Sequence, residues 1–170
     1  MWQKNLPLVV IPHGGPDTRV NMTFDFLRQF LANRGYVVLQ PNFRGSYGYG
    51  MPFTKAGLHQ WGLKMQDDIS DGVKKVIADG IADAKRVCVF GRAYGGYAAL
   101  AGATLTPELY ACVISYAGAA NLPDLLGYNK RQYREDFTNG SWDTTRVGDM
   151  FTDSAPRNSM RRRRRCMRAA

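Results

Sequence analysis

The residues that could do chemistry gather in one stretch, which reads Val-Cys-Val-Phe-Gly-Arg-Ala-Tyr-Gly-Gly-Tyr from residue 87 to 97. An apolar run meets Gly91, turns through three residues to Gly95 and Gly96, and continues into small and apolar residues that suit a helix. In hydrolases, such a strand, sharp turn and helix carry the pattern G-x-S-x-G, whose serine stands above the sheet as a nucleophile. Here the central residue is Ala93. The pattern predicts the scaffold of acyl transfer without its hydroxyl.

The segments around this turn alternate between strand patterns and helix patterns. Continuous apolar runs are typical of strands covered on both faces, and apolar residues three or four positions apart are typical of amphipathic helices. This alternation predicts an α/β fold with a mainly parallel sheet and helices on both faces. The expected strands cover residues 6–11, 36–40, 86–90 and 109–116, and the expected helices cover residues 24–31, 69–77 and 94–104.

Three loops with polar or glycine residues follow expected strands directly. They are His13-Gly14-Gly15, Arg44-Gly45-Ser46 and the turn from Gly91 to Gly95. Because ligands of parallel sheets bind at the carboxyl ends of the strands, we expect these loops to meet at one rim. Their convergence is a stronger signal than any single motif.

The composition suggests one globular domain, with 45% hydrophobic and 22% charged residues in a chain of 170. The net charge of +9 comes largely from Arg161 to Arg165 and Arg168, so the rest of the chain is only mildly basic. We predict that residues 157–170 form a disordered arginine-rich tail. Non-specific binding of this tail to nucleic acid or to an acidic membrane is the alternative, and no specific nucleic-acid partner is expected.

The spacing of the cysteines and the apolar runs of the chain argue against a metal site, a membrane span and a secretory leader. Cys88, Cys112 and Cys166 lack metal-ligand spacing, so we expect no metal or cofactor, and the first two lie in apolar runs where a reduced thiol acts as a small hydrophobe. No apolar run reaches the ~20 residues of a membrane span, and no secretory leader is evident. The compartment is therefore undetermined, with the cytoplasm as the default.

Four motifs together resemble the catalytic domain of the prolyl oligopeptidase family of serine peptidases. They are His13-Gly14-Gly15-Pro16, the run from Asn42 to Gly50, Gln60-Trp61-Gly62 with Asp67-Asp68, and Gly91-Arg92-Ala93-Tyr94-Gly95-Gly96-Tyr97. The likeness runs from about Leu6 to Leu126 in the family's order and spacing. It implies an α/β-hydrolase fold, here in part and assigned to residues 1–156, and substrates that are peptides or small esters.

The resemblance also implies roles for individual residues. Position 93 is that of the family's serine, the backbone N–H of Tyr94 would be one oxyanion donor, and the loop His13-Gly14-Gly15 would supply the other. The family's aspartate and histidine follow the elbow, whereas His13 and His59 both precede it. We therefore interpret the chain as an inactive fragment of a catalytic domain. A non-catalytic binding protein that retains the cleft is the alternative.

Other residues admit a structural or a functional interpretation. His13 either packs beside its turn or shapes the oxyanion site, and His59 is expected to be structural or solvent-facing. Arg44 could bind a carboxylate by its fork, but we expect it to brace neighbouring backbone. Asp67 and Asp68 are expected to be acids at a helix start rather than catalytic acids. A four-stranded sheet would leave an unpaired edge, which favours self-association.

Overall fold

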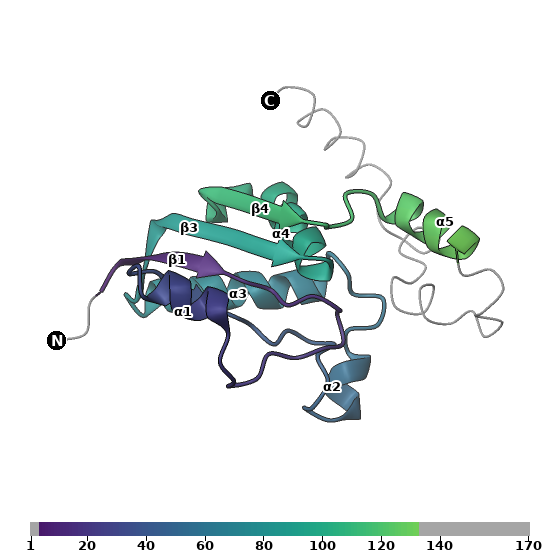
Figure 1. The fold of residues 1–170 in the computed structure, drawn as a ribbon, viewed down its shortest axis with the longest axis horizontal. Coiled ribbons are helices and arrows are strands. Elements are labelled where there is room, and N and C mark those ends of the chain that lie inside the picture. The colour runs from purple at the N-terminus through teal and green to yellow at the C-terminus, as the bar shows by residue number, and fades with distance from the viewer. Residues whose placement is uncertain (1–3, 133–170) are drawn as a thin grey trace, which may run out of the picture.

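The computed structural model describes residues 4–132, which form a four-stranded sheet flanked by helices (Figure 1). The predicted tail lies outside the described residues. All strand pairs are parallel, and the order in the sheet is β2-β1-β3-β4. The elements in chain order are β1 (Leu6–Val10), α1 (Phe26–Ala32), β2 (Val37–Leu39), α2 (Met51–Lys55), α3 (Lys64–Ala78), β3 (Ala82–Arg92), α4 (Tyr94–Leu105), the 3₁₀ helix η1 (Pro107–Leu109), β4 (Cys112–Tyr116) and α5 (Leu122–Gln132).

The core lies between one face of the sheet and helices α3 and α4. Alternate residues of β1 and β3 point into it, and α3 contributes a stripe of apolar side chains at helical spacing. Figure 1 shows α3 and α4 behind the sheet and α1 in front of it. The predicted parallel sheet with helices on both faces is therefore confirmed. The central core side chains are Leu8, Val10, Met65, Ile69, Val73, Val87 and Val89.

Helix α1 differs from its prediction. The spacing of its apolar residues indicated an amphipathic helix, but none of its residues is buried. Phe26 is 71% exposed, and Phe24, just before the helix, is 79% exposed. Periodicity defines an apolar stripe, whereas burial requires a second element to cover that stripe.

Several elements also begin at other residues than the sequence predicted. Strand β3 begins at Ala82 rather than near Arg86, because Ala82 pairs with Leu6 across an irregularity in the register. Strand β4 begins only at Cys112, because Pro107–Leu109 form a 3₁₀ helix. Helix α5 occupies part of a segment in which the sequence showed no convincing period.

The structure contradicts the prediction that Cys88 and Cys112 are reduced. The parallel register places them directly opposite each other on β3 and β4, with their Cα atoms 4.5 Å apart, and they form a disulfide. Cys112 is exposed rather than buried. The prediction failed because the two residues are 24 positions apart in sequence and only the strand order brings them together.

Candidate active site

The turn between β3 and α4 has the geometry of a nucleophile elbow. Ala93 has φ 54° and ψ −117°, which is a sparsely populated conformation for a residue with a Cβ. Its backbone N–H donates a hydrogen bond to the carbonyl oxygen of Tyr116 on β4, at 3.0 Å. Two neighbouring strands thus hold residue 93 at the carboxyl end of the sheet.

Glycines make this turn sterically feasible. A Cβ on Gly91 would lie 1.9 Å from the carbonyl oxygen of Gly95, and a Cβ on Gly95 would lie 2.1 Å from that of Pro12. A Cβ on Gly96 would lie 2.8 Å from Cα of Gly118, a close approach that the sequence analysis did not identify. Each distance is too short for a side chain, so backbone packing requires glycine at these positions.

The loop after β1 lies beside the elbow. A Cβ placed on Gly14 would be 3.1 Å from the carbonyl oxygen of Arg92 and 3.6 Å from Cβ of Ala93. Gly15 has φ 59°, so the loop turns sharply just after this contact. The structure thus brings together His13-Gly14-Gly15 and the elbow, two of the segments that the sequence placed at one rim.

The remaining rim segment, Arg44-Gly45-Ser46, is joined to the loop after β1 by a hydrogen bond of His13. The hydroxyl of Ser46 donates to the carbonyl oxygen of Phe43 at 2.7 Å, so its oxygen is free to accept from Nε2 of His13 at 2.9 Å. Thr18 Oγ1 lies 3.1 Å from Nδ1 of His13, a contact that no motif in the sequence indicated. Ser46 is fully buried, so this pair anchors the loop from inside.

Burial also determines the charge of His13. It lowers the pKa of the imidazole below its ordinary value, although the carbonyl groups of Gly14 and Gly15 and the charge of Asp17 act in the opposite direction. The ring is therefore neutral near pH 7, and one of its nitrogens can accept a hydrogen bond. His59, in contrast, is exposed.

An aromatic cluster supports the elbow from below. The side chain of Tyr94 points into the core, where its ring centroid lies 4.7 Å from that of Trp61 and 5.4 Å from that of Phe43. The Phe43 ring stacks on the His13 ring at 4.3 Å. Burial raises the pKa of the Tyr94 hydroxyl well above its ordinary value, so the side chain stays neutral. Only the backbone of Tyr94 is available at the rim.

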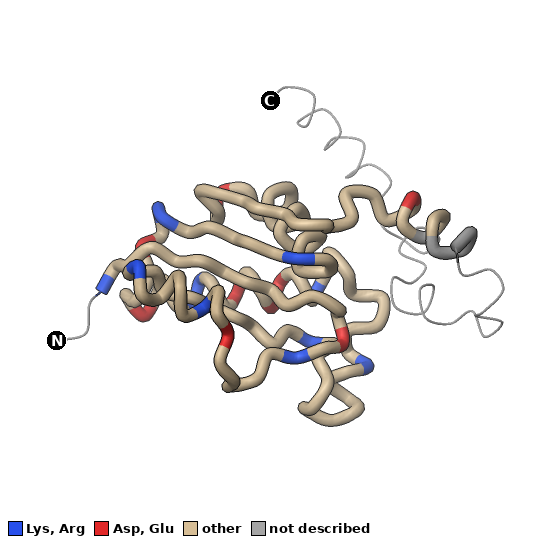
Figure 2. The backbone as a smooth tube through the Cα atoms, viewed as in Figure 1, with Lys and Arg blue, Asp and Glu red and all other residues tan. Residues whose placement is uncertain are grey.

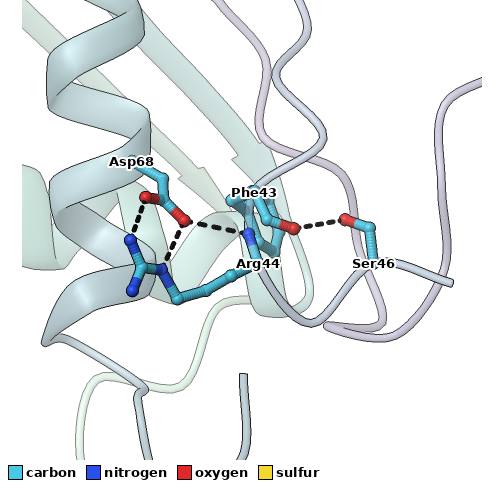
Figure 3. Close-up of polar contacts among 4 residues, drawn as sticks. All are labelled: Phe43, Arg44, Ser46 and Asp68. Atoms are coloured by element: carbon cyan, nitrogen blue, oxygen red, sulfur yellow. Dashed lines mark hydrogen bonds and ion pairs between the residues drawn. The ribbon is translucent and has the colours of Figure 1, made fainter. Parts of the chain in front are cut away.

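The loop after β2 is tied to α3 by a bidentate ion pair (Figure 3). Arg44 donates from Nη2 to Oδ1 of Asp68 at 2.6 Å and from Nε to Oδ2 at 2.7 Å, and its backbone N–H also donates to Oδ2. Burial acts to raise the pKa of Asp68, but these hydrogen bonds outweigh it and the net pKa is lowered. The guanidinium of Arg44 thus binds the carboxylate of Asp68, rather than the neighbouring backbone that we expected it to brace. Asp67 lies in the first turn of α3, whereas Asp68 serves as the partner of Arg44.

Within residues 4–132, no group of three or more His, Cys, Asp or Glu side chains could hold a metal ion. The same residues include no helix that is long and apolar enough to cross a bilayer.

Comparison with known proteins agrees with this geometry. Residues 22–165 match the profile of the family described as Prolyl oligopeptidase family. The chain is 41% identical over 149 residues to dipeptidyl aminopeptidase BIII of Pseudoxanthomonas mexicana, an alignment that covers 88% of this chain and 21% of that protein. The chain thus spans about a fifth of the length of this relative.

Solved structures share this fold. A puromycin-hydrolyzing peptidase of Mycobacterium tuberculosis superposes with a TM-score of 0.74 and 27% identity, over 88% of this chain and 22% of that one. A serine-to-alanine mutant of puromycin hydrolase, complexed with PGG, superposes with a TM-score of 0.68 and 27% identity, over 84% of this chain and 24% of that one.

Proposed function

The chain belongs to the prolyl oligopeptidase family, and from this premise we propose that it carries the elbow and oxyanion part of a peptidase site but does not hydrolyse substrate. The family acts on peptides, so peptides or small esters are the proposed ligand class. The observation that carries the proposal is Ala93 at the tip of the elbow. A methyl group stands where acyl transfer requires a nucleophilic oxygen.

The oxyanion part of the site supports ligand binding. Tyr94 opens α4, where the first N–H groups have no partner within the helix, and residue 93 offers no side-chain cap. Gly14 lies next to residue 93, and the pair of His13 and Ser46 anchors its loop. These backbone donors would polarise an acyl carbonyl that rests on the elbow.

Proton transfer is the second missing part. The chain contains two histidines, His13 and His59, and both precede the elbow in sequence. The ring nitrogens of His13 contact Ser46 and Thr18, so the ring is engaged in holding its loop. Restoring a hydroxyl at position 93 would therefore leave it without a general base.

Turnover assays on the chain and on Ala93→Ser test this proposal. We expect neither protein to hydrolyse dipeptide p-nitroanilides or p-nitrophenyl esters above the rate of Ala103→Ser, a control that places a serine on α4 away from the elbow. We also expect no covalent labelling by a fluorophosphonate. Labelling of Ala93→Ser but not of Ala103→Ser would show an activated hydroxyl and refute the proposal.

A non-catalytic binding protein is the second candidate, and the solved serine-to-alanine relative with a bound ligand favours it. Titration with an N-acetyl dipeptide amide, followed by amide NMR, separates the two. Saturable chemical-shift changes at the amides of Tyr94 and Gly14 would support peptide binding at the elbow. Changes elsewhere, or none, would refute the binding protein as a candidate.

We further propose self-association through the edge of β4, which within residues 4–132 pairs with β3 alone. Sedimentation velocity across a hundredfold range of concentration tests it. A species that stays monomeric throughout would refute it.

Arg161 to Arg165, the segment considered for non-specific nucleic-acid binding, lies outside the described residues.

A further inference from the structure

The Cys88–Cys112 disulfide lies on the open face of the sheet, at its β4 edge. Cys112 is exposed and Cys88 is half-buried. Further along the same face of β4, Ile114 is 50% exposed and Tyr116 is 61% exposed. Among the helices of residues 4–132, none stands in front of β3 and β4 in Figure 1, and Figure 2 shows β4 without charged residues. A small reagent can therefore approach this disulfide from solvent.

The same two strands hold the elbow. Ala93 directly follows β3, and its backbone N–H donates to the carbonyl oxygen of Tyr116, the last residue of β4. Just beyond β4, Gly118 packs tightly against Gly96 of α4. The position of β4 therefore determines how the backbone of residue 93 is held.

Apart from the disulfide, β4 is held mainly by backbone pairing with β3, from Cys112 to Tyr116. It is an edge strand, so it has one neighbour in the described sheet, and only Val113 among its side chains packs against the core. Edge strands with few buried side chains open at a lower free energy than central strands. The disulfide is thus a covalent link between β3 and β4, and β4 has few buried side chains to hold it otherwise.

We propose that Cys88–Cys112 is a thiol–disulfide exchange site for small thiols and dithiols, and that its reduction releases the elbow backbone at residue 93. This inference goes beyond the proposed function and does not depend on it, because it concerns no peptide ligand and no turnover.

The exchange proceeds in two balanced steps. A thiolate attacks Sγ of Cys112, the more exposed residue of the pair, and forms a mixed disulfide, while the Cys88 sulfur leaves as a thiolate and takes up a proton. A second thiol then attacks the added sulfur and frees Cys112. One protein disulfide is reduced, and one disulfide is formed from the two thiols of the reductant.

Thiol counting in Cys166→Ser tests the site. This variant is the matched background, because it removes the third cysteine and keeps the pair. We expect no free thiol in the folded, air-oxidised protein and two after dithiothreitol without denaturant. After brief treatment with glutathione and trapping with iodoacetamide, we expect glutathione on Cys112 and alkylation on Cys88. Two free thiols before reduction, reduction only in denaturant, or glutathione on Cys88 would overturn the proposal.

Amide hydrogen exchange tests the coupling to the elbow. In the reduced Cys166→Ser protein we expect the Ala93 amide to exchange at least about tenfold faster, whereas the amide of Val10 in central β1 changes less than about twofold. The variant that combines Cys88→Ser and Cys112→Ser with Cys166→Ser should match the reduced protein without any reductant. Equal exchange at Ala93 in oxidised and reduced protein would refute the coupling, and equal acceleration at Val10 would show global rather than local loosening.

Discussion

The two faces of the sheet are packed very differently. On the face covered by α3 and α4, core residues such as Leu8, Val10 and Val87 are at most 1% exposed. On the opposite face, Val9 of β1 is still buried, but Ile114 and Tyr116 of β4 are at least half exposed. The elbow takes its steric support from the first face, through the ring of Tyr94, and its backbone partner from the edge strand at the second. One structural unit therefore combines a rigid base with a weakly held neighbour.

Among the variants that test this difference in packing, a substitution at the elbow should lower the free energy of unfolding most. In Gly91→Ala the new Cβ would lie 1.9 Å from the carbonyl oxygen of Gly95, so α4 cannot keep its place. We expect the free energy of unfolding to fall by on the order of 4 kcal/mol. Urea denaturation followed by circular dichroism measures this loss.

Gly72→Ala is the matched control for that experiment. Its Cβ would lie 3.6 Å from Cδ2 of Leu39, an ordinary contact, and alanine is the better helix former within α3. We expect a gain of up to about 1 kcal/mol. Equal losses in the two variants would mean that steric crowding at Gly91 is not the cause.

Truncating one large side chain on each face tests the comparison directly. Met65 is fully buried beneath the elbow, so Met65→Ala should cost about 3 kcal/mol of unfolding free energy. Ile114 is 50% exposed, so Ile114→Ala should cost less than about 1 kcal/mol. Similar losses at both positions would show that another surface covers the open face in solution.

Two of the ion pairs that involve α3 should differ as well. Arg44 and Asp68 are joined by two side-chain hydrogen bonds and are partly buried, so a double-mutant cycle with Arg44→Ala and Asp68→Ala should give about 1 to 2 kcal/mol. The pair of Lys74 and Asp71 is exposed and should give less than about 0.5 kcal/mol. Equal coupling energies would argue against a bracing role for Arg44.

The smallest effect we expect is a pH dependence at His13. Burial lowers the pKa of its imidazole in the folded protein, so the unfolded chain takes up a proton first when the pH falls below 6.5. Stability is therefore complete above that pH and decreases as the pH falls toward the lowered pKa. Denaturation curves at pH 7.5 and pH 5.5 should show a smaller loss in His13→Gln than in the unchanged protein. His59→Gln, at an exposed histidine, should behave like the unchanged protein, and a full slope in His13→Gln would contradict the assignment.

Local patterns predicted much of the fold. The expected helix after the elbow became α4, and three of the expected strands lie within two residues of β1, β2 and the end of β3. Steric preferences act over a few residues, so glycine turns and apolar runs are visible in the sequence. Helix α5 was not predicted, because its apolar residues have no clear period.

The sequence by itself determined the strand, the glycine turn and the helix at Gly91 to Gly96, and also the absence of a hydroxyl at Ala93. The tertiary structure alone decided that His13 pairs with Ser46, that Tyr116 receives the amide hydrogen of Ala93, and that Cys88 lies opposite Cys112. These contacts join residues that are 23 to 33 positions apart. They depend on strand order and register, which result from packing the whole sheet rather than from local chain preferences.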